Sequence, residues 1–175
     1  RILGICGGYQ MMGTSLRDPQ GLEEKNQKET EGLKLFRMTT EFYPEKVLRK
    51  VEDFVDVRIF GARVSGKLEC YEIHMGQSVL EEPYDSLGSC GVIHPSGNLV
   101  GTYYHGLFES TEFRESFLNA LAQSVGKPRS GAPSLLSAGQ LKEIHYERLS
   151  DLLTRHLNLD LLRDALGVSE LKLCR

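Results

Sequence analysis

Several features that would assign this 175-residue chain to a particular class of protein are missing. No apolar run approaches the ~18 residues that span a membrane, and no signal-peptide pattern opens the sequence. The net charge of −3 offers no basic surface for nucleic acid or for an anionic membrane. We therefore expect a soluble, cytoplasmic protein that binds neither nucleic acid nor membrane.

Cysteines are few, and their spacing argues against two kinds of site. There is no C-x-x-C pair and no closely spaced set of cysteines and histidines, so neither a zinc site nor a disulfide framework is expected. The sequence thus predicts no metal in this chain and a reducing compartment. The four cysteines are Cys6, Cys70, Cys90 and Cys174.

One of them stands in the most informative segment of the chain. The apolar Ile2 and Leu3 are typical of a buried strand, and Met11–Gly13 indicates the first turns of a helix. A strand that passes into a helix through G-x-C-x-G is the cysteine form of a nucleophile elbow. The segment is Gly4-Ile5-Cys6-Gly7-Gly8-Tyr9-Gln10.

This pattern predicts that Cys6 is a nucleophile. We expect glycine to be necessary at Gly4 and Gly8, because a Cβ there would collide with the backbone of a sharp turn. The turn would set the sulfur at the positive end of the helix, which favours the thiolate. The alternative is a buried, inert cysteine, the common state of a free cysteine; the flanking glycines weigh against it.

The remaining pattern predicts an α/β protein whose middle strands are antiparallel. Strands are expected at 55–59 and 67–73, and a hairpin at 91–93 and 99–104 around Pro95–Asn98. The polar stretch 16–31 is expected to be a solvated loop. Helices are predicted at 112–124, with Thr111 as N-cap and Gly126 as stop, at about 138–157, and at 159–166, with Gly167 as C-cap.

These elements suggest a domain at 1–126, a linker at 127–137 and a helical segment at 138–175 that packs on the same domain. The chain begins with Arg1 directly on a core strand. Such a strand normally has neighbours on both sides. We therefore expect a C-terminal piece of a longer polypeptide.

A cysteine nucleophile needs a histidine as base and then as acid. His105 is the best candidate, because it ends a predicted strand, where the active sites of open α/β sheets collect, and Gly106 permits close approach. His74 also ends a strand, and a packing role is weighed more heavily for it. His94 is expected to be structural. Leu107 occupies the position that shares a face with His105, so the group that orients the imidazole stays unidentified.

At these residues the sequence resembles the triad-type (class I) glutamine amidotransferases, and among them the glutaminase domains of cobyric acid synthases. The blocks that carry the resemblance are Ile2–Gly13, Asp18–Glu23, Tyr71–Gly76, Gly101–Phe108 and Tyr146–Leu162. The resemblance implies a class I amidotransferase-like, flavodoxin-like domain without its N-terminal strands, followed by C-terminal helices.

The resemblance also implies a role for each site residue. Cys6 would attack the side-chain amide of glutamine, and His105 would serve as base and acid. The Gly7 N–H would form half of the oxyanion hole, and Gln10 would help to hold glutamine. The class usually has Glu two residues after the histidine, where Leu107 stands here, so weak glutaminase activity is expected from the chain alone.

The family further implies partners outside this chain. An N-terminal synthetase domain of the same polypeptide would use ATP and Mg²⁺ to activate a corrinoid substrate, adenosylcobyrinic acid a,c-diamide, for amidation at b, d, e and g in cobalamin biosynthesis. No cofactor is expected in the chain itself. The alternatives are a cobyrinate a,c-diamide synthase, a glutaminase that amidates peptidoglycan precursors, a cysteine hydrolase, or a non-catalytic remnant.

Overall fold

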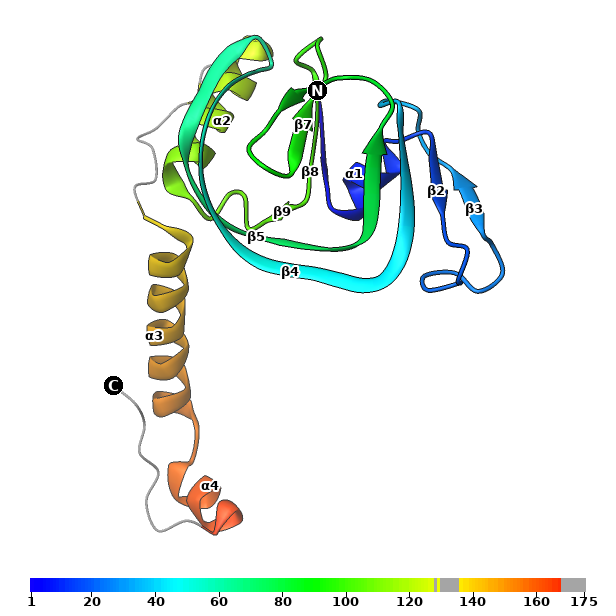
Figure 1. Ribbon diagram of the computed structural model, residues 1–175. Helices are drawn as coiled ribbons and strands as arrows, with labels where there is room; N and C mark the ends of the chain where they lie inside the picture. Colours follow the sequence, from blue (N-terminus) through cyan, green and yellow to red (C-terminus); the bar gives the residue numbers. More distant parts are fainter. Residues whose placement is uncertain (128, 130–135, 168–175) are drawn as a thin grey trace. The chain divides into compact units, whose positions relative to one another are not determined.

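The computed structural model describes residues 1–127, 129 and 136–167. The chain forms two compact units, Arg1–Leu135 and Leu136–Arg175, and each is described by itself. The first unit contains all the strands of the described residues (Figure 1). Strands and helices are mixed along the chain, which confirms the predicted α/β character.

The first unit is built from two sheets. One has the order β1-β8-β7-β6 and the other β3-β2-β4-β5-β9. In the first sheet, β1 and β8 run parallel and the remaining pairs are antiparallel. The strands are β1 Ile2–Ile5, β2 Ser15–Arg17, β3 Glu29–Glu31, β4 Met38–Ile59, β5 Ala62–Leu80, β6 Asp85–Ser86, β7 Gly91–Ile93, β8 Leu99–Thr102 and β9 Tyr104–His105.

A long antiparallel hairpin of β4 and β5 dominates the second sheet and curves around the first unit (Figure 1). The strands predicted at 55–59 and 67–73 lie inside β4 and β5. The hairpin predicted at 91–93 and 99–104 is β7 paired with β8, but β8 ends at Thr102 and Tyr104 belongs to β9. The ladder is interrupted between Phe42 and Val47, where the register shifts. Such an irregularity bends a strand and re-aims its side chains.

The prediction of a loop at 16–31 was partly wrong. Leu16 and Arg17 belong to β2, which pairs with β4 on one side, and Glu29–Glu31 forms β3 on the other. The segment is too polar to bury a face of its own. Its strand β2 is held by pairing with β4, which lies outside the segment, and local patterning does not report such a partner.

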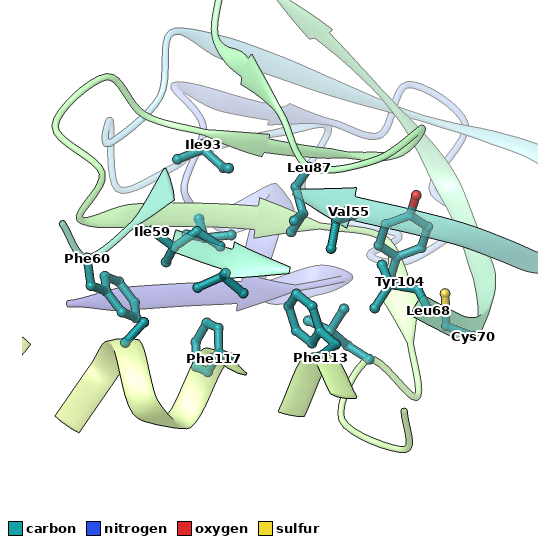
Figure 2. Packing of buried hydrophobic residues seen from close by; sticks show 14 residues of the cluster. Val55, Ile59, Phe60, Leu68, Cys70, Leu87, Ile93, Tyr104, Phe113 and Phe117 are labelled. Atoms are coloured by element: carbon teal, nitrogen blue, oxygen red, sulfur yellow. The ribbon is translucent and has the colours of Figure 1, made fainter. Parts of the chain in front are cut away.

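The main core lies between the sheets and helix α2, Thr111–Ser124 (Figure 2). The predicted helix at 112–124 is confirmed, although its N-cap is Ser110 and not Thr111. Phe113 and Phe117 point from α2 toward the strands, and both are buried (Figure 2). This packing fixes the far end of the β4–β5 hairpin, which contributes Val55, Ile59, Val64 and Leu68 to the same cluster.

The second unit contains α3, Ala138–His156, and α4, Leu159–Leu166. A capping box of Ser137 and Gln140 begins α3, and Gly167, at φ 64°, ends α4, so both predicted helices are confirmed. None of the helices of the described residues has the length and apolar character that crossing a membrane requires. Residues 168–175 of the predicted helical segment lie outside the described residues, and its packing on the first unit stays a prediction.

Candidate active site

The candidate nucleophile stands at a tight turn between a strand and a helix. β1 ends at Ile5, and helix α1 begins at Gly7 and ends at Met11. Cys6 therefore occupies the turn alone, with φ 51° and ψ −115°, a conformation that is strained for a residue with a side chain. The prediction that Met11–Gly13 starts the helix was wrong, since α1 ends there after five residues.

The glycine prediction for this turn is confirmed at one position and wrong at the other. A Cβ on Gly4 would lie 2.4 Å from the Met12 sulfur and 2.8 Å from the carbonyl oxygen of Gly8. A Cβ on Gly8 would have no atom within 4 Å. The close approach of β1 and α1 thus depends on Gly4, whereas Gly8 faces open space.

Beside this turn lies a cavity of about 670 Å³. All five of the candidate site residues predicted from the sequence line it: Cys6, Gly7, Gln10, His74 and His105. Its other walls come from β2, from the stretch 18–33 and from the irregular part of β4. Residues up to 99 positions apart in the chain therefore share one cavity, as the nucleophile hypothesis required.

Cys6 and His105 meet at one backbone oxygen. The Cys6 thiol donates to the carbonyl of Ile73 at 3.4 Å, and Nε2 of His105 donates to the same oxygen at 3.1 Å. Cys6 follows β1 of the first sheet, whereas His105 ends β9 of the second and pairs with Tyr71 of β5. The structure thus brings the two predicted residues within a hydrogen-bond length of a common atom.

Gln10 is anchored behind the cavity by a chain of buried polar groups. Its side-chain amide donates to the hydroxyl of Tyr103 at 3.4 Å. That hydroxyl lies 2.6 Å from Ser78 Oγ, which lies 2.7 Å from Thr40 Oγ1. Burial raises the pKa of Tyr103, so its hydroxyl stays neutral and available for hydrogen bonds.

His74 is involved in a second polar cluster at the same wall. Its Nδ1 lies 2.6 Å from the carbonyl oxygen of Gly76, and its Nε2 lies 2.9 Å from a carboxylate oxygen of Glu72. Arg49 also donates to Glu72. Sequence reasoning missed Glu72, although the E-x-H spacing places both side chains on one face of a strand and was a usable signal.

The other histidines of the described residues lie in elements that the sequence predicted, a turn and a helix. His94 is bonded to Ser96 Oγ at 2.9 Å within the turn between β7 and β8, and it is not among the residues that line the cavity of Cys6. His145 and His156 belong to α3. Leu107, the residue on the face expected to orient His105, is buried in the main core at 2% exposure.

The remaining thiols of the described residues differ from Cys6. Burial raises the pKa of Cys70 to about 11 and that of Cys90 to about 12, so both stay protonated at neutral pH. Cys6 instead is half-buried and faces the cavity. No group of His, Cys, Asp and Glu in the described part of the chain is arranged to hold a metal ion.

Comparison with known proteins places the chain in a family. Residues 1–113 match the family model of the CobB/CobQ-like glutamine amidotransferase domain. The chain is 34% identical over 180 residues to the cobyric acid synthase of Clostridium tetani, and this match covers 95% of the chain and 34% of that protein. The synthase of Syntrophobacter fumaroxidans is also 34% identical, over 181 residues, covering 95% and 35%. That of Brucella canis is 39% identical over 131 residues, covering 72% and 26%.

These similarities place the chain among the glutamine amidotransferases. More narrowly, the chain belongs to the family of CobB/CobQ-like glutamine amidotransferase domains. It spans about a third of the length of the first two relatives.

Proposed function

We propose that this chain is the glutaminase part of a cobyric acid synthase that supplies ammonia for cobalamin biosynthesis. The observation that carries the proposal is the meeting of Cys6 and His105 at the carbonyl of Ile73, at the edge of a cavity of about 670 Å³. The strained conformation of Cys6 between β1 and α1 supports a nucleophile elbow.

In this proposal Nε2 of His105 gives up its hydrogen bond to Ile73 and, in the tautomer with the hydrogen on Nδ1, takes the thiol proton of Cys6. The thiolate then attacks the side-chain carbonyl carbon of glutamine. The imidazolium returns the proton to the amide nitrogen, so that ammonia leaves and a γ-glutamyl thioester remains. Water, deprotonated by His105, then cleaves the thioester to give glutamate and the free thiol.

Two groups are assigned to the bound substrate. Gly7 begins α1, and a backbone N–H at the start of a helix has no partner inside that helix. The Gly7 N–H would therefore donate to the oxyanion of the tetrahedral intermediate. Gln10, held by Tyr103, would bind the substrate amide.

The cavity also offers charges of both signs, as a free amino acid requires. Asp18 turns the chain so that Glu23 and Glu24 line the cavity, through hydrogen bonds from the N–H groups of Leu22, Glu23 and Glu24 at 2.8, 2.8 and 3.0 Å. The bond from Glu24, with those from its neighbours, outweighs desolvation and lowers the pKa of Asp18. Lys46 reaches the cavity from the irregular part of β4. These charges favour glutamine over an uncharged amide or ester.

The ammonia would serve a synthetase domain of the same polypeptide, N-terminal to this one, that uses ATP and Mg²⁺. We propose four amidations there, at the b, d, e and g carboxylates of adenosylcobyrinic acid a,c-diamide. The coverage of about a third of each of the first two relatives is consistent with this division. The proposal places both domains in the cytoplasm.

A covalent probe tests the glutaminase assignment. A diazoketone analogue of glutamine should modify Cys6, free glutamine should slow the modification, and Cys6→Ser should abolish it, as read by peptide mass spectrometry. Iodoacetamide, which carries no amino-acid group, serves as the matched reagent. If iodoacetamide modifies Cys6 and the diazoketone does not, the thiol is reactive without glutamine recognition, and a cysteine hydrolase becomes the better assignment.

Cys6→Ser in the complete polypeptide tests the division of labour. Amidation driven by glutamine should be lost, while amidation driven by added ammonium should persist at the wild-type rate. Loss of both activities would contradict a separate ammonia-using site.

A further inference from the structure

His74 lines the cavity but has no role in the mechanism above. Both of its ring nitrogens face hydrogen-bond acceptors. Nδ1 meets the carbonyl oxygen of Gly76 at 2.6 Å, and Nε2 meets the carboxylate of Glu72 at 2.9 Å. A carbonyl and an ionised carboxylate accept but do not donate. An imidazole that donates in both contacts carries a hydrogen on each nitrogen, and only 9% of the His74 side chain is exposed.

The surroundings of the ring support this charge state. Burial acts to raise the pKa of Glu72, but hydrogen bonds from His74 and Arg49 outweigh it and hold the pKa below its ordinary value. Glu72 is therefore a carboxylate. Another neighbour is Tyr103, whose neutral ring stacks on that of His74 at a centroid distance of 3.9 Å and an angle of 23°. A positive ring over an aromatic face is a favourable contact.

Glu72 and His74 also flank Ile73, whose carbonyl oxygen accepts from both Cys6 and His105. Glu72, Ile73 and His74 are consecutive in β5, and the Ile73 carbonyl is the acceptor of both the Cys6 thiol and His105 Nε2. The backbone of Glu72 pairs with Tyr104, the neighbour of His105. The side-chain bonds of Glu72 and His74 therefore hold the strand on both sides of this carbonyl.

A protonated His74 at this wall would also act on the nucleophile. His74 lines the same cavity as Cys6. Helix α1 has only five residues, so its dipole contributes little to stabilising a thiolate. The imidazolium is a full charge in a partly dry site, where an opposite charge within several ångströms is favoured.

We propose that Glu72 and His74 form a positioning pair for this active site: the imidazolium of His74, fixed by Glu72, keeps the Ile73 carbonyl between Cys6 and His105 and favours the thiolate of Cys6. Leu107 leaves this site without a carboxylate two residues after His105. Glu72 supplies a fixed carboxylate instead, but it is bonded to His74 on β5 and not to His105. The proposal rests on the glutaminase function for the roles of Cys6 and His105.

The test is the pH profile of Cys6 alkylation by iodoacetamide, measured on the full chain by peptide mass spectrometry. In His74→Gln, which keeps polar side-chain bonding but removes the charge, the midpoint should move up by about one pH unit. The rate at pH 7 should fall roughly tenfold if the midpoint lies above 7, since only the thiolate reacts. His94→Gln, at a half-buried histidine with its own serine partner, is the matched control and should leave the profile unchanged.

An unchanged midpoint in a folded His74→Gln protein would overturn the proposal. If that variant does not fold, ¹⁵N chemical shifts of the histidine rings in the unmodified protein decide the matter. Both nitrogens of His74 should be protonated at pH 7.5, and a neutral tautomer contradicts the pair. Because iodoacetamide does not need glutamine recognition, the pair can fail while diazoketone labelling succeeds, and the reverse.

Discussion

The contact between β1 and α1 gives a sharp prediction, because two nearby glycines differ in what surrounds them. In Gly4→Ala the new Cβ would lie 2.4 Å from the sulfur of Met12, which is itself 1% exposed and has little room to move. The sulfur would have to retreat by about 1 Å to restore an ordinary contact. The carbonyl of Gly8 at 2.8 Å cannot move without displacing α1.

Overpacking of this kind costs about 1–3 kcal/mol of the free energy of unfolding. Displacement of α1 also displaces Gly7 and Gln10 relative to Cys6. A misplacement of about 1 Å at a reacting centre can cost on the order of a hundredfold in rate. We therefore expect Gly4→Ala to slow diazoketone labelling of Cys6 by about tenfold to a hundredfold.

Gly8→Ala is the matched control within the same segment. Its Cβ would have no atom within 4 Å, and Gly8 lies in a helix at an exposed position. Alanine is favoured over glycine in a helix by about 0.5–1 kcal/mol, so this variant should be as stable as the wild type or slightly more stable. Its labelling rate should be unchanged.

Urea unfolding gives the stability difference, and intact-protein mass spectrometry gives the labelling rate. The reasoning fails if Gly4→Ala matches the wild type in both measurements. It also fails if Gly8→Ala loses as much as Gly4→Ala, because the glycine requirement would then come from the turn itself and not from the contact with Met12.

Three further outcomes follow from burial and charge. At pH 8, iodoacetamide should modify Cys6 and spare Cys70 and Cys90, whose raised pKa values keep them protonated; equal modification of the folded protein, read by peptide mass spectrometry, would contradict the burial of those two thiols. Phe113→Ala, at a fully buried position, should lower the free energy of unfolding by about 3–5 kcal/mol and the melting temperature by roughly 10 °C or more in calorimetry. A shift of less than a few degrees would mean that α2 packs loosely. The folded state lowers the pKa of Glu72, so the stabilisation by this carboxylate is present above its ordinary pKa of 4.5 and is lost as the pH falls through its pKa in the folded state. Glu72→Gln should therefore lower the urea midpoint at pH 7 and converge with the wild type in acid. A difference that stays constant with pH would falsify the ion pair.

Much of the site could be predicted from the sequence, because its parts are local. The motif around Cys6 predicts a strand-to-helix turn, and the apolar spacing of Phe113 and Phe117 predicts α2. His105 was predicted from its place at the end of a strand, and the structure brings it to the cavity of Cys6. Signals of this kind depend only on neighbouring residues.

The rest depends on partners that sequence patterns do not contain. Ile73 contributes a backbone oxygen to the site, and any residue at that position could do so. The full length of the β4–β5 hairpin is obscured by its charged, exposed residues, which interrupt the alternation of a half-buried strand. Gly8 was misjudged because the motif marks both glycines alike, while only the three-dimensional contact distinguishes them.

The attachment of Cys6 and His105 to different sheets has a mechanical consequence. Cys6 follows β1, and His105 belongs to a two-residue strand carried by β5. A sliding of one sheet across the other by a fraction of an ångström would alter the separation of thiol and imidazole, while each residue kept its own strand partners. Shear between packed layers is a common form of conformational change in proteins. A force on the curved hairpin would thereby change that separation without touching either reacting group.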